Sequence, residues 1–399
     1  MSGDRRPTIC LFAADISGDQ NAGRLARPLR ELVPNVRLLG AGGASMRAAG
    51  IDVRVETTDY SFVGVLSSLR FLGPLLDRYR QVKRLVREVR PDLVVLIDSE
   101  SVAVPLARWL RRNGIPTIFY FPPQVWFWGR WRLPRIVPLA RRVLSTFATE
   151  ADIWASAGAD ARWVGHPLRD AVRTGDDGAA ALHALGLDPE RPLVAIMPGS
   201  RHSEIRKLSA AFFGAARELQ RRDPRLQFAV PLASESLRAE LEAELRRSGV
   251  RDAAIYRPQS YSVLGRARVV IQSSGTATLE TALLGIPSVI AYRCIPLEYY
   301  VARYLLIRVR YIGMVNILLD AMVQPEFFNR NIDAEHLAEE AWSLLTDERR
   351  REWIRSRLAR LPELLGPPGV MRRTAEAVVD MLPQRLSEPE PVRLTSAGG

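Results

Sequence analysis

The stretch Val269-Val-Ile-Gln-Ser-Ser-Gly-Thr-Ala-Thr-Leu-Glu280 decides the fold. Three apolar residues end a buried strand, small hydroxyl residues form a turn around Gly275, and a helical apolar pattern begins at Ala277. Such a turn directs free backbone N–H groups beyond the sheet, which suits a diphosphate. Glu280 lies about one helical turn further on, where its carboxylate can accept hydrogen bonds from a ribose diol. A plain strand–helix connection with a Ser/Thr N-cap has the same pattern, so the stretch leaves both interpretations open.

A second turn of the same kind, Pro198-Gly-Ser-Arg201, favours the phosphate interpretation. It follows an expected strand at residues 193–197, and a helix is expected from about Ser203. Gly199 lets a phosphate approach the backbone, Ser200 donates a hydrogen bond, and Arg201 adds a charged fork. The Gly-Lys-Thr/Ser of a nucleoside triphosphate P-loop is missing here, so ATP hydrolysis is not expected.

Length and composition predict a two-domain cytoplasmic protein. The chain has 399 residues, which is too long for one ordinary core, and its 47% hydrophobic content is ample for burial. Cys10 and Cys294 make neither a disulfide framework nor a zinc pattern, which favours a reducing compartment. We expect no signal peptide and no membrane-spanning helix. Metal ligands do not recur at any recognisable spacing, so no metal and no cofactor are expected.

The net charge of +12 points to an anionic partner. Nucleic acid is not expected, because the arginines are scattered along helices and no nucleic-acid-binding fingerprint occurs. Phosphorylated substrates and an anionic membrane surface remain. Two segments mix apolar and basic residues: residues 62–71 with the helix expected at 75–90, and residues 296–313. Each is either part of the core or of a domain contact, or a surface that meets a membrane interface.

The first half opens as a doubly wound sheet does. A strand at residues 8–14 runs into Asp15-Ile-Ser-Gly-Asp19, and a helix follows at about residues 20–32. Gly18 lies where the backbone must come close to a helix start or a ligand. The glycine-rich residues 40–43 follow the next strand without the spacing of a dinucleotide fingerprint, so a nicotinamide site is weakly supported.

Asp98 ends the clearest parallel strand of the chain, at residues 93–99. Ligands of open α/β sheets lie beyond the carboxyl ends of the strands, so this carboxylate is directed toward a ligand. Two roles stay open for it: a general base, or an N-cap for the helical segment that starts at Val102.

Aromatic residues follow the strand expected at residues 117–121. Residues 122–132 contain three tryptophans and two arginines, which either pack or bind an amphiphilic or sugar-bearing ligand. Gly165-His166-Pro167 ends a later strand. His166 is either a donor that faces the ligand or a capping or packed histidine.

These features predict an α/β protein with two Rossmann-like, doubly wound domains facing across a crevice, which is the layout of a nucleotide-sugar transferase. The expected divisions are residues 1–175 for an acceptor and membrane-side domain and 176–345 for a UDP-sugar domain. Residues 346–384 are C-terminal helices that can pack back on the first domain, and 385–399 are an expected disordered tail.

The motifs also resemble, in order and spacing over roughly residues 8–345, the lipid-A-disaccharide synthases. The matching segments are Ser17-Gly18-Asp19, Pro123-Gln124-Val125-Trp126-Phe127-Trp128, Gly165-His166-Pro167, Pro198-Gly199-Ser200-Arg201 with Glu204, Ser274-Gly275-Thr276-Ala277-Thr278-Leu279-Glu280, and Asn316. The Trp-rich segment together with the others is the specific part of this resemblance.

The resemblance implies a GT-B fold and a peripheral membrane enzyme at the cytoplasmic face of the inner membrane. A homodimer is a further open alternative. The implied reaction is inverting transfer of an acylated glucosamine from its UDP derivative to an acylated glucosamine 1-phosphate. The residue matching the family's proposed base is Asp98, and those matching its UDP site include Arg201, Glu280 and Asn316. The leaving diphosphate would be held by the two turns and Arg201 in place of a metal.

Three departures from the family's usual pattern lie in the acceptor-side half. Asp15 stands where the family usually has Glu, residues 99–103 replace Ala-Pro-Asp-Phe-Asn, and Ser67 replaces a common Glu. The donor nucleotide is therefore better supported than the acceptor, which can be another lipid. Glu100 is the fallback base. Alternatives are a UDP-N-acetylglucosamine-type transferase or epimerase of related fold, and a catalytically silent protein that binds a UDP-sugar.

Overall fold

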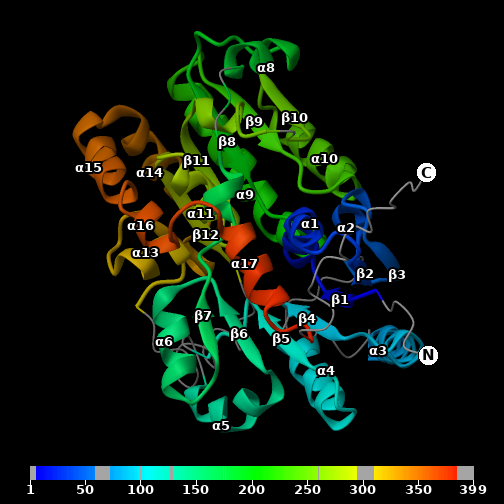
Figure 1. The fold of residues 1–399 in the computed structure, drawn as a ribbon. Coiled ribbons are helices and arrows are strands. Elements are labelled where there is room, and N and C mark those ends of the chain that lie inside the picture. The colour runs from blue at the N-terminus through cyan, green and yellow to red at the C-terminus, as the bar shows by residue number, and fades with distance from the viewer. Residues whose placement is uncertain are drawn as a thin grey trace, which may run out of the picture. The chain divides into compact units, whose positions relative to one another are not determined.

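The computed structural model describes residues 6–58, 72–98, 100–125, 129–173, 175, 177–258, 260–293 and 310–383. The chain forms two compact units (Figure 1). Unit 1 consists of Met1–Pro167 with Pro368–Gly399, and unit 2 consists of Leu168–Pro367. Each unit is an α/β layer structure around its own sheet.

Unit 1 is built on a seven-stranded parallel sheet in the order β3-β2-β1-β4-β5-β6-β7. Its strands are β1 (Thr8–Ala13), β2 (Arg37–Gly42), β3 (Asp52–Glu56), β4 (Leu93–Ile97), β5 (Thr117–Tyr120), β6 (Arg142–Ser145) and β7 (Ala161–Trp163). The strand order reverses between β1 and β4. In doubly wound sheets this switch point is where ligands bind.

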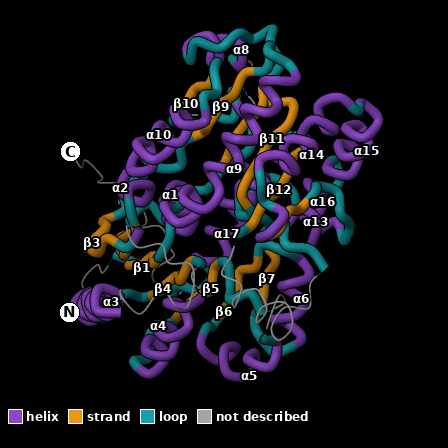
Figure 2. Tube along the Cα trace, turned by 180° about the vertical axis from the view of Figure 1, so that it is seen from behind, coloured by secondary structure: helices purple, strands orange, loops and turns teal. Residues whose placement is uncertain are grey.

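Helices cover both faces of the unit 1 sheet, so its central strands are apolar throughout (Figure 2). The helices are α1 (Ile16–Leu32), α2 (Ala44–Ala48), α3 (Leu72–Val89), α4 (Glu100–Arg112), α5 (Leu133–Ile136), α6 (Ala148–Ser156) and α17 (Val370–Val379). Ile9 and Leu11 of β1 face a core shared with α1 and α17, whereas Cys10 and Phe12 face one shared with α3 and α4. The alternation follows from the two-residue period of a strand.

The last helix, α17, returns to unit 1 from the far end of the chain and packs on α1. Arg142, at the start of β6, holds it in place. The Arg142 Nη1 donates to the Ala377 carbonyl at 2.8 Å, and its Nε pairs with Asp160 Oδ2 at 2.8 Å.

Unit 2 is built on a six-stranded parallel sheet in the order β10-β9-β8-β11-β12-β13. Its strands are β8 (Leu193–Met197), β9 (Gln227–Pro231), β10 (Ala253–Tyr256), β11 (Ala267–Ser273), β12 (Ser288–Tyr292) and β13 (Glu326–Phe328). Its helices are α7 (Leu168–Ala171), α8 (Gly178–Ala184), α9 (His202–Arg222), α10 (Arg238–Ser248), α11 (Ala277–Leu283), α13 (Met314–Leu319), α14 (Ala334–Thr346), α15 (Glu348–Leu358) and α16 (Leu361–Leu365). Here the order reverses between β8 and β11.

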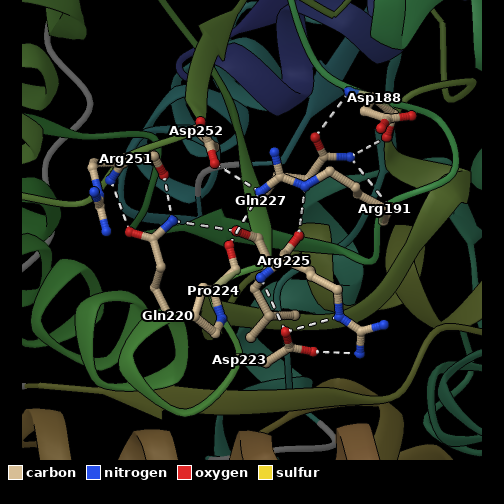
Figure 3. A network of polar contacts seen from close by, with 10 residues as sticks. Asp188, Arg191, Gln220, Asp223, Pro224, Arg225, Gln227, Arg251 and Asp252 are labelled. Carbon is tan, nitrogen blue, oxygen red and sulfur yellow. Dashed lines mark hydrogen bonds and ion pairs between the residues drawn. The ribbon is translucent and has the colours of Figure 1, made fainter.

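A polar network fastens the starts of three unit 2 strands at the edge opposite their carboxyl ends (Figure 3). Gln227, the first residue of β9, accepts the Asp188 N–H at 2.9 Å. Gln220 bonds both backbone groups of Arg251, which leads into β10, at 2.7 and 2.9 Å. Because these bonds fix the strand starts, the loops at the other edge extend from a rigid base.

The strand predicted at residues 193–197 and the helix start predicted at Ala277 coincide with β8 and the start of α11. The division between units falls at Pro167 and Leu168 instead of at residue 175. The composition shift at residues 176–178 marks the start of α8. The C-terminal helices divide between the units, since α15 and α16 belong to unit 2 and α17 to unit 1.

Several expectations fall on residues outside the described ranges. These are the apolar segment 62–71 with Ser67, Ser99, residues 126–128 with Trp126 and Trp128, residues 296–309 of the basic segment 296–313, and the tail. Among the helices that are described, none combines the length and the apolar character that crossing a bilayer requires.

Candidate functional site

Both turns for which the sequence predicts diphosphate binding lie at the switch point of the unit 2 sheet. Strands β8 and β11 are adjacent and parallel, with Met197 opposite Gln272. The turns that follow, at residues 198–201 and 274–276, therefore leave the same edge of the sheet side by side. The two motifs that the sequence analysis singled out separately are thus brought together by the pairing of these strands.

The turn at residues 274–276 exposes backbone donors. The Ser274 N–H donates to the Ala291 carbonyl at 3.1 Å, and the Thr278 N–H to the Gly275 carbonyl at 3.1 Å. In the part of the chain that the structure describes, the N–H groups of Gly275, Thr276 and Ala277 donate to no backbone or side-chain acceptor. Gly275 and Thr276 are exposed, and a Cβ on Gly275 would meet no atom within 4 Å. This turn can therefore accept an anion without rearrangement.

The turn at residues 198–201 is closed by Glu204 from the first turn of α9. The Ser200 N–H donates to Glu204 Oε2 at 2.8 Å, and Arg201 Nη1 donates to Glu204 Oε1 at 2.8 Å. Gly199 has φ 139°, and a Cβ there would lie 2.4 Å from Glu204 Oε2, so only glycine fits. Glu204 thus orients the guanidinium of Arg201, which is about a third exposed.

Glu280 is half-buried in α11, next to the turn at 274–276. Asn316, which the resemblance matches to the UDP site, lies in helix α13. The Asn316 amide is fully buried and donates to the Gln324 carbonyl at 2.6 Å and to Glu326 Oε1 at 2.7 Å. Its oxygen accepts the N–H groups of Val323 and Gln324, each at 2.9 Å. Asn316 therefore shapes the segment between α13 and β13.

Asp98 follows β4 at the switch point of the unit 1 sheet. Its backbone has φ 58°, a left-handed conformation that non-glycine residues adopt rarely and that clusters at functional sites. The Asp98 N–H donates to the Tyr120 carbonyl at 3.0 Å, which fixes the backbone beside β5. Gly18 in the first turn of α1 allows close packing, because a Cβ there would lie 3.2 Å from the Ile97 carbonyl oxygen.

The residues after β1 have capping roles in the structure. Asp15 caps α1 by accepting the Gly18 N–H at 2.6 Å. Asp19 is buried and accepts the N–H groups of Gly43 at 2.6 Å and Ser45 at 2.8 Å, so it holds the start of α2. Ser17 is half-buried in α1. Asp19 therefore binds α2, a helix that the sequence analysis did not anticipate.

Two further residues that the sequence analysis assigned to the acceptor side are Glu100 and Gln124. Glu100 begins α4 and forms an ion pair with Arg132, with Nη2 at 3.5 Å from Oε2 and a closer contact through Nη1. A carboxylate held by a guanidinium is a weaker base than one in an apolar setting. Gln124 is exposed after β5.

His166 is packed between aromatic rings near the carboxyl ends of β5 and β6. Its ring lies 5.6 Å from that of Phe121, edge-on, and 5.6 Å from that of Phe147. Burial, with a smaller contribution from the positive charge of Arg24, lowers the pKa of His166 from 6.5 to about 3. The imidazole is therefore neutral at physiological pH, and of the two roles considered for it, the packed one describes its contacts.

The buried His166 should make folding pH-dependent. The unfolded chain binds a proton at this residue below its ordinary pKa of 6.5, whereas the folded chain does not until about pH 3. Stability is therefore complete above pH 6.5 and falls as the pH drops, by up to about 1.4 kcal/mol per pH unit from this group. We expect His166→Gln to flatten the plot of unfolding free energy against pH between 6.5 and 4. Parallel plots for variant and wild type would assign the dependence to other groups.

Sequence reasoning missed two polar side chains of the unit 2 sheet that hold neighbouring segments in place. Gln272 is fully buried and bonds Thr281 and Ser288, and Glu326 accepts the N–H groups of Ile312 and Gly313 at 2.9 and 2.7 Å. A glutamine inside an otherwise apolar strand was the available signal for the first. For Glu326 no local pattern exists, since its partners lie more than ten residues away.

The chain is similar in sequence to known proteins over nearly its whole length. A family model described as lipid-A-disaccharide synthetase matches residues 9–373. The lipid-A-disaccharide synthase of Geobacter metallireducens is 36% identical over 374 residues, which cover 94% of this chain and 97% of that protein. That of Myxococcus xanthus is 32% identical over 377 residues, covering 94% and 98%.

Solved structures share the fold at low sequence identity. The kitacinnamycin glycotransferase has a TM-score of 0.59 at 15% identity, covering 95% of this chain and 100% of that one. The UDP-GlcNAc 2-epimerase of Methanocaldococcus jannaschii, solved with UDP-GlcNAc and UDP, has a TM-score of 0.60 at 10% identity, covering 94% and 100%. The fold class expected from the sequence, α/β of the GT-B type with two parallel-sheet units, is thereby confirmed.

Proposed function

The chain belongs to the lipid-A-disaccharide synthase family, and from this premise we propose that it is a UDP-sugar glycosyltransferase acting on acylated glucosamines. It transfers an acylated glucosamine from its UDP derivative to an acylated glucosamine 1-phosphate and releases UDP. The observation that supports this most directly is the adjacency of the turns at residues 198–201 and 274–276 at the unit 2 switch point. A diphosphate fits a place where two such turns meet.

The roles divide between the units. In unit 2, Arg201 and the free N–H groups of the turn at 274–276 stabilise the charge that develops on the leaving diphosphate. Glu280 accepts hydrogen bonds from the ribose hydroxyls. In unit 1, Asp98 takes the proton from the acceptor hydroxyl. The new bond joins that oxygen to the anomeric carbon, the bond from this carbon to the phosphate oxygen breaks, and the electron pair leaves with UDP, so that the configuration inverts.

UDP release in the presence and absence of acceptor tests this assignment. We expect UDP release from the acylated UDP-glucosamine only when an acylated glucosamine 1-phosphate is added, together with a disaccharide product by mass spectrometry. Conversion of UDP-N-acetylglucosamine without any acceptor would instead identify an epimerase. UDP binding by calorimetry without turnover of any acylated donor would identify a silent binding protein.

We propose further that unit 1 associates with an anionic membrane, at the inner face of the plasma membrane where such a lipid acceptor would be met. The surface formed by α3 and α4 supports this. Lys83 Nζ lies 4.2 Å from the Tyr79 ring centre, and the Arg87 guanidinium lies 5.3 Å from that of Trp109. Other basic residues on the two helices that form no ion pair within the described ranges are Arg80, Arg84, Arg108, Arg111 and Arg112. Aromatic rings beside unneutralised cations suit an anionic interface.

Vesicle binding tests the membrane proposal. We expect the protein to sediment with vesicles that contain anionic lipid, and salt to weaken the binding. Each basic residue near such a surface contributes about 1 kcal/mol, so Arg84→Glu with Arg108→Glu should lower partitioning at least about 30-fold. Arg217→Glu with Arg349→Glu, which reverses two exposed charges on α9 and α15 of unit 2, is the matched control. Equal losses for both sets of changes would show that net charge alone drives binding and would overturn the assignment to α3 and α4.

A further inference from the structure

A ladder of buried polar side chains lies directly beneath the turn at residues 274–276. It starts at Gln272 near the end of β11, whose side chain is fully buried. Gln272 Nε2 donates to Ser288 Oγ of β12 at 2.7 Å and to Thr281 Oγ1 of α11 at 2.8 Å. One amide thus connects two strands and the helix that follows the turn.

The ladder continues through α11 to the turn itself. The Thr281 hydroxyl donates to the Thr278 carbonyl at 3.1 Å, and the Thr278 hydroxyl donates to the Gly275 carbonyl at 2.7 Å. The Thr281 hydroxyl donates toward Thr278 and accepts from Gln272 Nε2. The donors therefore follow one another from Gln272 through Thr281 and Thr278 to the Gly275 carbonyl.

This ladder is maintained at an energetic cost. Gln272, Thr278, Thr281 and Ser288 are all fully buried, where apolar side chains of similar size would fill the same space. Gln272 Oε1 has no hydrogen-bond partner among the described residues, and a buried polar atom without a partner destabilises the fold. Polar groups kept at such a position indicate a requirement other than stability.

We attribute this requirement to the orientation of the Gly275 carbonyl, which the polar side chains set. The Thr278 hydroxyl and the Thr278 N–H both hold this oxygen, the second at 3.1 Å, and so fix the peptide between Gly275 and Thr276. With the carbonyl turned toward Thr278, the Thr276 N–H at the other side of the peptide plane is left to face outward. We propose that Gln272 and Thr278 are positioning residues that aim the N–H groups of this turn at the diphosphate of the donor. This inference rests on the proposed function, since it takes the turn as the diphosphate site.

Isosteric removal of one hydroxyl tests the ladder. We expect Thr278→Val to raise the Kd for UDP, measured by calorimetry, about fivefold to tenfold, and the KM for the UDP-sugar by a similar factor, while the KM for the acceptor stays unchanged. Thr278→Ser keeps the hydroxyl and should restore both values. Gln272→Leu removes the donor to Thr281 and should shift the same two constants in the same direction.

The matched control is Thr374→Val in α17 of unit 1. Thr374 is also fully buried, and its hydroxyl also donates to a carbonyl of its own helix, that of Val370, at 2.8 Å. We expect this change to lower Tm as Thr278→Val does and to leave UDP binding intact. If wild-type protein binds UDP and Thr278→Val binds it equally well, the positioning role is overturned while the proposed function stands. If the wild type binds no UDP, the proposed function itself fails.

Discussion

Asp98→Asn should lower the turnover number by a factor of about 10² to 10⁴ while the protein stays folded, because a positioned general base contributes about that much to the rate. Asparagine has the shape of aspartate and tolerates the left-handed backbone that Asp98 adopts at φ 58°. The variant therefore loses the proton acceptor and keeps the geometry. Initial rates of UDP release with saturating donor and acceptor measure the effect, and an unchanged Kd for UDP shows that the donor site is intact.

The same substitution separates the two roles that the sequence left open for Asp98. Asparagine caps a helix about as well as aspartate, so a purely capping residue would tolerate the exchange in both Tm and rate. Glu100→Gln is the companion variant, because Glu100 is the other carboxylate near this strand end and is engaged by Arg132. We expect it to retain most of the activity. Full activity in Asp98→Asn with loss in Glu100→Gln would transfer the base to Glu100.

The sequence could predict the donor-side turns because their signal is local. The apolar strands β8 and β11 end at Met197 and Ser273, small residues follow, and a helix begins after no more than four intervening residues. Their adjacency follows from the order β8-β11, in which strands about 70 residues apart in the sequence become neighbours. A doubly wound topology implies this order, so the switch point was within reach of sequence reasoning.

The remaining features depend on partners that are distant in the sequence. The sequence places Asp19 in a turn on the ligand side of the sheet. In the structure its carboxylate accepts the N–H groups of Gly43 and Ser45 at the start of α2. Asn316 matches a UDP-site residue in the sequence, but in the structure Gln324 and Glu326 surround its amide. A side chain with several hydrogen-bonding groups can serve either a ligand or the fold. Only the positions of its neighbours decide between the two, and no local period encodes them.

Gly275→Val should abolish most UDP binding with little change in Tm. A Cβ on Gly275 would meet no atom within 4 Å, and the backbone there is outside the left-handed region, so a larger side chain costs no strain. That side chain would instead fill the open space above the turn, where we place the diphosphate, and keep it from the N–H groups. The equivalent change at Gly199 would be uninformative, because a side chain there collides with Glu204 and its φ is 139°.

A graded series at Gly275 makes the result decisive. Glycine, alanine and valine add successively more volume above the turn, so the Kd for UDP should rise in that order. We expect a total rise of at least about tenfold, because losing one or two charge-assisted hydrogen bonds to the diphosphate costs more than about 1.5 kcal/mol. General destabilisation would instead make Tm follow the same order. If Gly275→Val binds UDP as tightly as the wild type, the diphosphate does not approach this turn. The donor site must then be sought at a different strand end of unit 2, even though the family assignment holds.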